Sequence, residues 1–148
     1  MVDLNLLKKL REETEISLAE CKSALEEANG DLNKAKEILK KRYGEMAKKK
    51  EGKKAKEGIV DAYVHHGQKI GVLIEVRCES DFVANHPEFK KMVHELCLQI
   101  AAIDPREIPL LDQRWIKDES KTIKELISEY IAKFDENIVV ERFARFEL

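Results

Sequence analysis

The sequence predicts an α+β fold, in which an N-terminal three-helix module is joined by a linker to a small antiparallel sheet packed with helices. Three observations support this prediction. Apolar residues recur at helical spacing over residues 3–43, charged residues dominate 45–57, and from Gly58 the apolar period changes to two. We therefore expect a helical module at 1–44, a lysine-rich linker at 45–57 and an α+β core of about three strands at 58–148.

The N-terminal module is expected to contain three short amphipathic helices. Asp3, Ser17 and Asp31 are placed to cap their N-termini, since side-chain oxygens there accept hydrogen bonds from free backbone amides. Gly44 is expected just past the end of the third helix. A bundle of this size is close to the lower limit for independent stability, and its commonest role is to dock onto another protein.

The charged segment at 45–57 is rich in lysine and contains no aromatic residue that could stack on bases. We interpret it as a solvated linker, with an RNA-binding or ribosome-associated arm at 48–56 as the alternative. The whole chain carries 27 Lys and Arg against 29 Asp and Glu, a net charge of −2. This balance argues against a general nucleic-acid-binding protein, and we expect no direct nucleic-acid partner.

Residues 58–78 alternate as two strands of a hairpin with its turn at His66-Gly67-Gln68, where glycine supplies a positive φ. A helix beginning at Pro87 and ended by Asp104-Pro105 is expected to cover one face of the hairpin. The following segment is expected to be irregular, with a short strand near Leu110-Leu111.

The C-terminal part is expected to hold one helix and one strand. The helix covers about residues 121–134, preceded by two exposed or half-buried apolar residues, Trp115 and Ile116. The strand runs from 138 to 146. Its apolar residues fall on both faces, which predicts a partner surface such as a homodimer formed through the sheet. One face carries Ile138, Val140, Ala144 and Phe146, and the other carries Val139 and Phe143.

No motif for catalysis, metal binding or membrane insertion is found. A phosphate loop and a dinucleotide-binding glycine motif are both missing, and Cys21, Cys78 and Cys97 have no C-x-x-C partners. No apolar run approaches the roughly 18 residues of a membrane helix, and the N-terminus lacks a signal-peptide pattern. We expect a cytoplasmic protein that is not an enzyme and needs no metal or cofactor. An enzyme whose site assembles from scattered residues is a further alternative.

The segment from Cys78 to His86 joins the hairpin to the next helix. At such a junction Asp81 and Phe82 together present one hydrogen-bond acceptor and one apolar wedge. The ordinary interpretation of Phe82 is that it packs beneath the junction.

Several segments, in the same order, resemble elongation factor Ts, the guanine-nucleotide exchange factor for the translational GTPase EF-Tu. Ser80-Asp81-Phe82-Val83-Ala84 is similar to the Thr-Asp-Phe-Val-Ala signature of that family. Further matching segments are found at 6–14, 20–25, 28–31, 66–73 and 136–147. The segment between about 104 and 113 is shorter than is usual in the family.

The resemblance implies an exchange factor whose Asp-Phe pair pushes between two helices of the GTPase and disturbs its Mg²⁺ site. It also implies that the N-terminal module is similar to a ubiquitin-associated (UBA) domain and docks on the nucleotide-binding domain. Some single-core members pair through their sheets, and Ala144 replaces a cysteine associated with that pairing. The expected wedge residues are Ser80, Asp81, Phe82 and Val83, and the other expected contacts are Lys22, His66, Gly67, Trp115 and Ile116.

Overall fold

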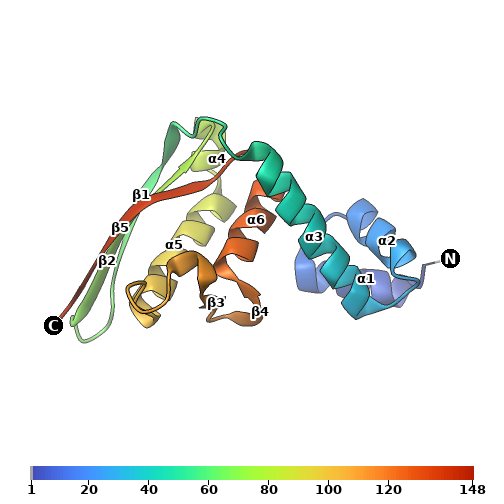
Figure 1. The fold of residues 1–148 in the computed structure, drawn as a ribbon, viewed down its shortest axis with the longest axis horizontal. Coiled ribbons are helices and arrows are strands. Elements are labelled where there is room, and N and C mark those ends of the chain that lie inside the picture. Colours follow the sequence, from blue (N-terminus) through green and yellow to red (C-terminus); the bar gives the residue numbers. More distant parts are fainter. Residues whose placement is uncertain (1) are drawn as a thin grey trace.

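A computed structural model describes residues 2–148 and confirms the predicted α+β fold. Three N-terminal helices lie at one end of the molecule and a three-stranded antiparallel sheet lies at the other, with two helices between them (Figure 1). The helices are α1 (Leu4–Thr14), α2 (Leu18–Glu27), α3 (Leu32–Lys50), α4 (Asp81–Ala84), α5 (Pro87–Ala102) and α6 (Ile123–Phe134). The strands are β1 (Glu57–Val64), β2 (Ile70–Cys78), β3 (Arg114–Trp115), β4 (Asp118–Thr122) and β5 (Val139–Glu147).

The N-terminal helices begin at the predicted caps. Asp3 accepts a hydrogen bond from the backbone amide of Asn5 at 2.8 Å, and Asp31 accepts one from that of Lys34 at 3.1 Å. Ser17 caps α2. The three helices enclose a small apolar cluster of their own, made of Leu10, Cys21, Ala24, Leu25, Ala28, Ala35, Leu39 and Tyr43.

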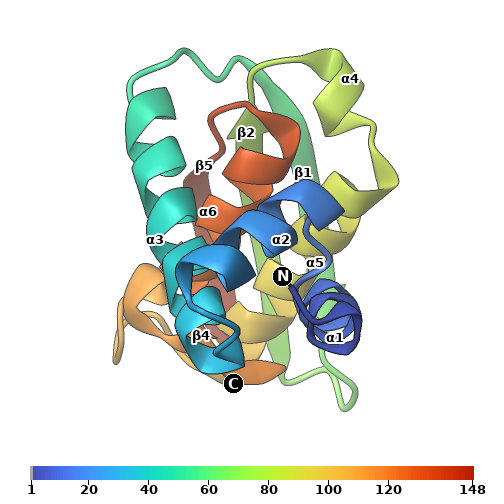
Figure 2. The ribbon, with the colours of Figure 1, turned by 90° about the vertical axis from the view of Figure 1, so that its right-hand side faces the viewer.

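The prediction that the third helix ends at Gly44 is wrong, because α3 continues to Lys50. A single glycine in a helix costs only about 1 kcal/mol, and tertiary contacts beyond it offset this cost. Ala47 packs against the core of the α+β part, and Lys50 forms a 3.0 Å ion pair with Asp135 just after α6. Figures 1 and 2 both show α3 alongside α6. The first part of the predicted linker is therefore helical.

The hairpin agrees with the prediction. Its pairing runs from Glu57 opposite Cys78 to Val64 opposite Gly71. The turn has positive φ at Gly67 (90°) and also at Gln68 (61°). Strand β5 pairs antiparallel with the other side of β2, which gives the order β1-β2-β5.

Helix α5 packs against β1 and β2 on one face of this sheet, as expected for the helix that follows the hairpin, and α6 lies on the same side of the sheet (Figure 1). The main core lies between them and the strands. Its fully buried members include Ile74 and Val76 from β2, Phe89 and Leu96 from α5, and Ile123 from α6. Burying such side chains stabilises the fold by roughly 1.5–3 kcal/mol each.

The strand predicted near Leu110-Leu111 is wrong. These residues lie in a 3₁₀ helix, η1 (Leu110–Asp112), whose turn is closed by the Asp112 amide donating to the Pro109 carbonyl at 2.9 Å. In this turn Leu110 reaches the core while Leu111 faces solvent. The two short strands that follow, β3 and β4, form a separate ribbon.

The last strand is present, but its predicted alternation is wrong beyond Val140. A bulge at Glu141 lets Val140 pair with Val76 and Arg142 pair with Glu75. Because one extra residue reverses the faces, Ala144 and Phe146 lie on the side of the sheet opposite to Val140. We call this side the outer face, and its apolar residues are Val60, Ala62, Val64, Leu73, Ala144 and Phe146.

Candidate functional site

The candidate site is the four-residue helix α4, which connects β2 to α5. Ser80 caps this helix, because its Oγ accepts a hydrogen bond from the Val83 amide at 3.2 Å. At the other end, the Asn85 side chain donates to the Asp81 carbonyl at 3.0 Å. Both ends of the short helix are thus closed by side chains of the predicted motif or next to it.

The four residues of α4 divide into two that are buried and two that face solvent. Val83 and Ala84 are 3% and 1% exposed, and they belong to the main core. Asp81 is exposed, and Phe82 is 79% exposed. Phe82 therefore does not pack beneath the junction, which was the ordinary interpretation of the sequence. The helix is therefore anchored in the core by Val83 and Ala84, and it exposes the Asp81 carboxyl and the Phe82 ring to solvent.

The loop before α4 is fixed to the segment leading into β5 by two glutamates, one in each of the two. The Glu136 carboxylate accepts from the backbone amides of Glu79 and Ser80 at 3.0 and 2.9 Å, and from the Ser80 hydroxyl at 2.6 Å. In return, the Glu79 carboxylate accepts from the Asn137 amide. The sequence alone predicts no role for Glu79, Glu136 or Asn137, because nothing in one sequence pairs residues so far apart.

Aromatic rings border the wedge on one side. The Phe82 ring centroid lies 6.4 Å from that of His86, and His86 lies 5.1 Å from Phe134 on α6. Beneath the junction, the Cys78 thiol donates to the Ser80 carbonyl at 3.3 Å. Burial raises the pKa of this thiol to about 11, so it stays neutral at physiological pH. The residues beneath and beside α4 thus combine aromatic rings with a neutral thiol.

The other predicted contact residues are not brought together with α4. His66 and Gly67 are exposed at the hairpin tip, which lies at the opposite end of the sheet from α4 (Figure 1). Lys22 is exposed on α2, at the end of the molecule away from the sheet. The predicted residues therefore form separate points along an extended surface and not one pocket.

Trp115 and Ile116 lie at the β3–β4 ribbon and differ in exposure. Trp115 packs against the main core, with the Lys121 ammonium 5.7 Å from its ring centroid. Ile116 is 43% exposed, while its backbone amide donates to the buried Gln99 side chain at 2.9 Å. Trp115 is half-buried and Ile116 is exposed, so Ile116 presents the more accessible side chain of the two.

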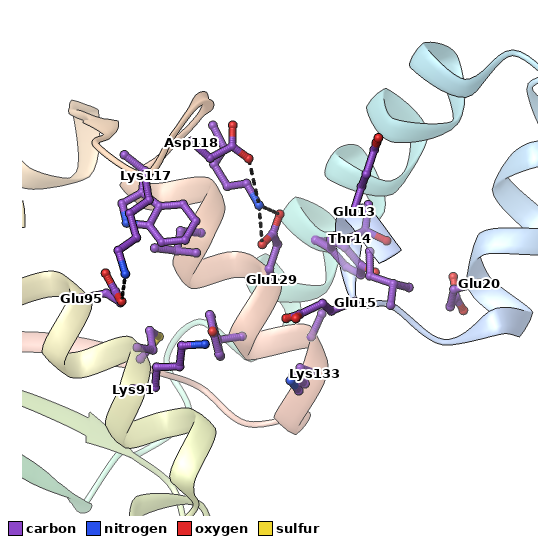
Figure 3. Close-up of a pocket in the computed structure, with 18 of the residues that line it drawn as sticks. Glu13, Thr14, Glu15, Glu20, Lys91, Glu95, Lys117, Asp118, Glu129 and Lys133 are labelled. Carbon is purple, nitrogen blue, oxygen red and sulfur yellow. Dashed lines mark hydrogen bonds and ion pairs between the residues drawn. The ribbon is translucent and has the colours of Figure 1, made fainter. Parts of the chain in front are cut away.

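A cavity of about 630 Å³ lies between the N-terminal module and α5, α6 and the β3–β4 ribbon (Figure 3). Some of its charged side chains are paired with one another. Lys121 contacts Glu129 at 3.0 Å, and Lys117 pairs with Glu95. Burial is the main cause that raises the pKa of Glu129.

The part of the chain from residue 2 to 148 shows neither a metal site nor a membrane-spanning helix. The described residues contain no group of three or more His, Cys, Asp or Glu side chains arranged to hold a metal ion. None of the helices described is long and apolar enough to cross a membrane.

Comparisons with known proteins agree with the motifs. Residues 79–148 match the family model described as Elongation factor TS, and residues 14–43 match one for a UBA-like domain. The chain is 41% identical to elongation factor Ts of Thermoanaerobacter sp. (strain X514) over 193 aligned positions, which cover 99% of this chain and 95% of that relative. It is 40% identical to elongation factor Ts of Caldanaerobacter subterraneus, with 99% of this chain and 96% of that relative covered. It is 38% identical to elongation factor Ts of Carboxydothermus hydrogenoformans, with 100% of this chain and 89% of that relative covered. These alignments are longer than the chain, so the relatives contain residues that it lacks.

Proposed function

The chain belongs to the elongation factor Ts family, and on that premise we propose that it is a guanine-nucleotide exchange factor for EF-Tu. One observation supports this proposal above all. Phe82 is 79% exposed on a helix whose next two residues are buried, so an apolar side chain is held outward by a rigid base. Single exposed apolar residues are common, but a fixed one beside an acidic group at a capped helix has the form of a wedge.

In this proposal, Asp81 and Phe82 enter between two helices of the GTPase next to its Mg²⁺ site. Burying the Phe82 ring yields roughly 1.5–3 kcal/mol, which is enough to displace a marginal helix contact when a wide docking surface supports it. A displaced helix disturbs the Mg²⁺ coordination, and a nucleotide whose Mg²⁺ no longer bridges its phosphates is released faster. The step forms no covalent bond, so it needs no acid, base or cofactor from this chain.

The same proposal assigns the remaining predicted residues to docking. Strand β2 has nine residues, and at about 3.3 Å per residue it places the hairpin tip roughly 30 Å from α4. Contacts through His66 and Gly67, through Trp115 and Ile116, and through Lys22 would then spread over a broad surface of EF-Tu. Because binding is thermodynamically reciprocal, the factor weakens GDP binding as much as GDP weakens binding of the factor.

Release of a fluorescent GDP from bacterial EF-Tu tests the proposal. The unchanged chain should accelerate release, and Phe82→Ala should reduce the acceleration by roughly tenfold or more. Ile108→Ala is the matched control, since it truncates another exposed apolar residue in the loop after α5. Equal acceleration by the unchanged chain and Phe82→Ala would refute the wedge. No acceleration by either would refute the exchange function, and RNA binding through the lysines of 48–56 would be tested next.

We also propose that the chain forms a homodimer through the outer face of its sheet. Val60, Val64, Leu73 and Phe146 are all exposed there, on the face of the sheet opposite to the one that α5 covers. Monomeric proteins seldom leave such a contiguous apolar surface in water. Since Ala144 lies on this face, pairing would not depend on a disulfide at that position. Sedimentation should give a dimer that Phe146→Glu converts to a monomer, and a monomer at tens of micromolar for the unchanged chain would refute pairing.

The proposed site of action is the cytoplasm, where translation elongation takes place.

A further inference from the structure

We propose that Glu136 is a positioning residue of the wedge: its carboxylate fixes α4 so that Phe82 points outward, without itself needing to touch the GTPase. This inference rests on the proposed function and assigns a role to a residue outside the Asp-Phe motif. It is carried by a set of hydrogen bonds between two segments that are distant in the sequence.

Both oxygens of the Glu136 carboxylate are used. Oε1 accepts from the backbone amides of Glu79 and Ser80, and Oε2 accepts from the Ser80 hydroxyl. Hydrogen bonds to an ionised carboxylate are roughly twice as strong as those between neutral groups. The Ser80 Oγ in turn accepts from the Val83 amide, so the carboxylate acts through Ser80 on the first turn of α4.

A second set of contacts fixes Glu136 itself. The next residue, Asn137, is only 7% exposed, and its amide donates to the Glu79 carboxylate. The Asn137 side chain donates to the Lys53 carbonyl at 2.9 Å, in the segment between α3 and β1. Strand β5 begins at Val139 and pairs with β2 from there. The carboxylate is thus held by contacts that Asn137 makes outside α4 and by the strand that follows it.

Helix α4 needs such support because of its length. Four residues are too few for a helix to stabilise itself, since forming the first turn fixes several backbone dihedrals for very few hydrogen bonds. The buried Val83 and Ala84 hold one side of the helix, but they do not fix its N-terminal residues. Without the Glu136 carboxylate, the backbone amides of Glu79 and Ser80 and the Ser80 hydroxyl would all lose their acceptor immediately before Asp81 and Phe82.

The test compares Glu136→Ala and Glu136→Gln with Glu141→Ala, an exposed glutamate on β5, as the matched control. GDP release from EF-Tu is measured over a range of factor concentrations, which separates the maximal rate from the concentration for half-maximal effect. We expect Glu136→Ala to lower the maximal rate about tenfold, the equivalent of one charge-assisted hydrogen bond, with little change in the half-maximal concentration. Glu136→Gln should recover part of the rate, since the amide oxygen can still accept from both backbone amides. The control should behave as the unchanged chain.

A second measurement uses the free protein and does not depend on EF-Tu. In Glu136→Ala, the amide protons of Glu79 and Ser80 should exchange faster with solvent and shift upfield in NMR spectra, while those of β1 and β2 stay as they are. Unchanged exchange and shifts at these two amides would overturn the inference. So would an unchanged maximal rate, or a change confined to the half-maximal concentration.

The two proposals fail in different ways. If the unchanged chain accelerates release but Glu136→Ala and Glu136→Gln do so equally well, the positioning role is overturned and the exchange function stands. If the unchanged chain does not accelerate release, the exchange function is overturned, and any role of Glu136 in exchange is overturned with it. If Glu136→Ala does not fold, GDP release and the amide signals are both measured on Glu136→Gln instead. Full activity of Glu136→Gln together with native signals of the Glu79 and Ser80 amides would then overturn the inference.

Discussion

Replacing Gly58 and Gly44 by alanine should change the free energy of unfolding in opposite directions. Gly58 lies in β1 with φ at +148°, opposite Arg77 of β2. A Cβ added there would lie 2.2 Å from the Val76 carbonyl oxygen and 2.7 Å from the Arg77 Cα. Both neighbours are backbone atoms of the central strand, which cannot rotate away as a side chain would. Gly58→Ala must therefore push the start of β1 away from β2.

The size of the effect follows from what this movement breaks. Losing about two backbone hydrogen bonds costs roughly 1 kcal/mol each, and an unfavourable φ adds about 1–3 kcal/mol. We expect Gly58→Ala to lower the free energy of unfolding by about 3–5 kcal/mol. Gly44 differs because it lies inside α3 with ordinary helical geometry, and a Cβ there meets nothing within 4 Å. Gly44→Ala should raise the free energy of unfolding by about 0.5–1 kcal/mol.

Urea denaturation followed by circular dichroism measures both changes against the unchanged chain. With a slope of roughly 1–3 kcal/mol per molar urea, the two midpoints should move clearly in opposite directions. A Gly58→Ala midpoint equal to that of the unchanged chain would refute the close approach of β1 to β2. A loss of stability in Gly44→Ala would refute the continuous α3 and restore the helix end that the sequence predicted at this glycine.

Two further predictions concern titrating groups. Burial is the main cause that raises the pKa of the Cys97 thiol to about 12, and all three cysteines are buried, so a thiol reagent at pH 8 should label the chain only after unfolding. Rapid labelling of the native chain would contradict this. The Arg106 side chain beside Asp104 lowers the pKa of that carboxyl from 3.8 to about 2. Because the folded state favours the ionised form, Asp104 should stabilise the fold above pH 4 and lose this effect as the pH falls toward 2. Arg106→Ala should raise the pKa of Asp104 in an NMR titration, and an unchanged value would contradict the ion pair.

The elements that the sequence predicted correctly are those determined by local pattern. The hairpin turn follows from alternating strands around His66-Gly67-Gln68, and the start of α5 follows from Pro87. Their hydrophobic periods need no knowledge of the rest of the chain, because a side chain's face is set by its neighbours in sequence. The same is true of the three N-terminal caps.

The errors arise where distant contacts determine the outcome. Helix α3 passes Gly44 because Ala47 and Lys50 find partners in and beside the core, and no local pattern contains those partners. The bulge at Glu141 is set by pairing with β2, and it moved Phe146 to the opposite face of the sheet. A single extra residue in a strand is invisible to an argument based on a period of two.

The candidate site was reached by two different routes with different success. The junction after the hairpin already indicated Asp81 and Phe82, but the residues alone favoured a packed Phe82, and the family resemblance favoured the wedge. The structure shows this ring in solvent. Neither the residue pattern nor the family resemblance predicts a role for Glu136. It lies within a matching segment, but its contact with Ser80 is visible only once the two segments are side by side.

The exposure of Phe82 separates its contribution to folding from its contribution to binding. A ring that is 79% exposed in the folded chain gains little from folding, so nearly all of its transfer free energy is still available when a partner covers it. The side chains of its neighbours Val83 and Ala84 are buried in the core, so their transfer free energy already contributes to folding. Phe82→Ala should therefore change the free energy of unfolding by no more than about 0.5 kcal/mol, even as it slows nucleotide release. If Phe82→Ala instead destabilised the free chain by 2 kcal/mol or more, as truncation of a core residue does, the ring would be part of the core and the wedge proposal would fail.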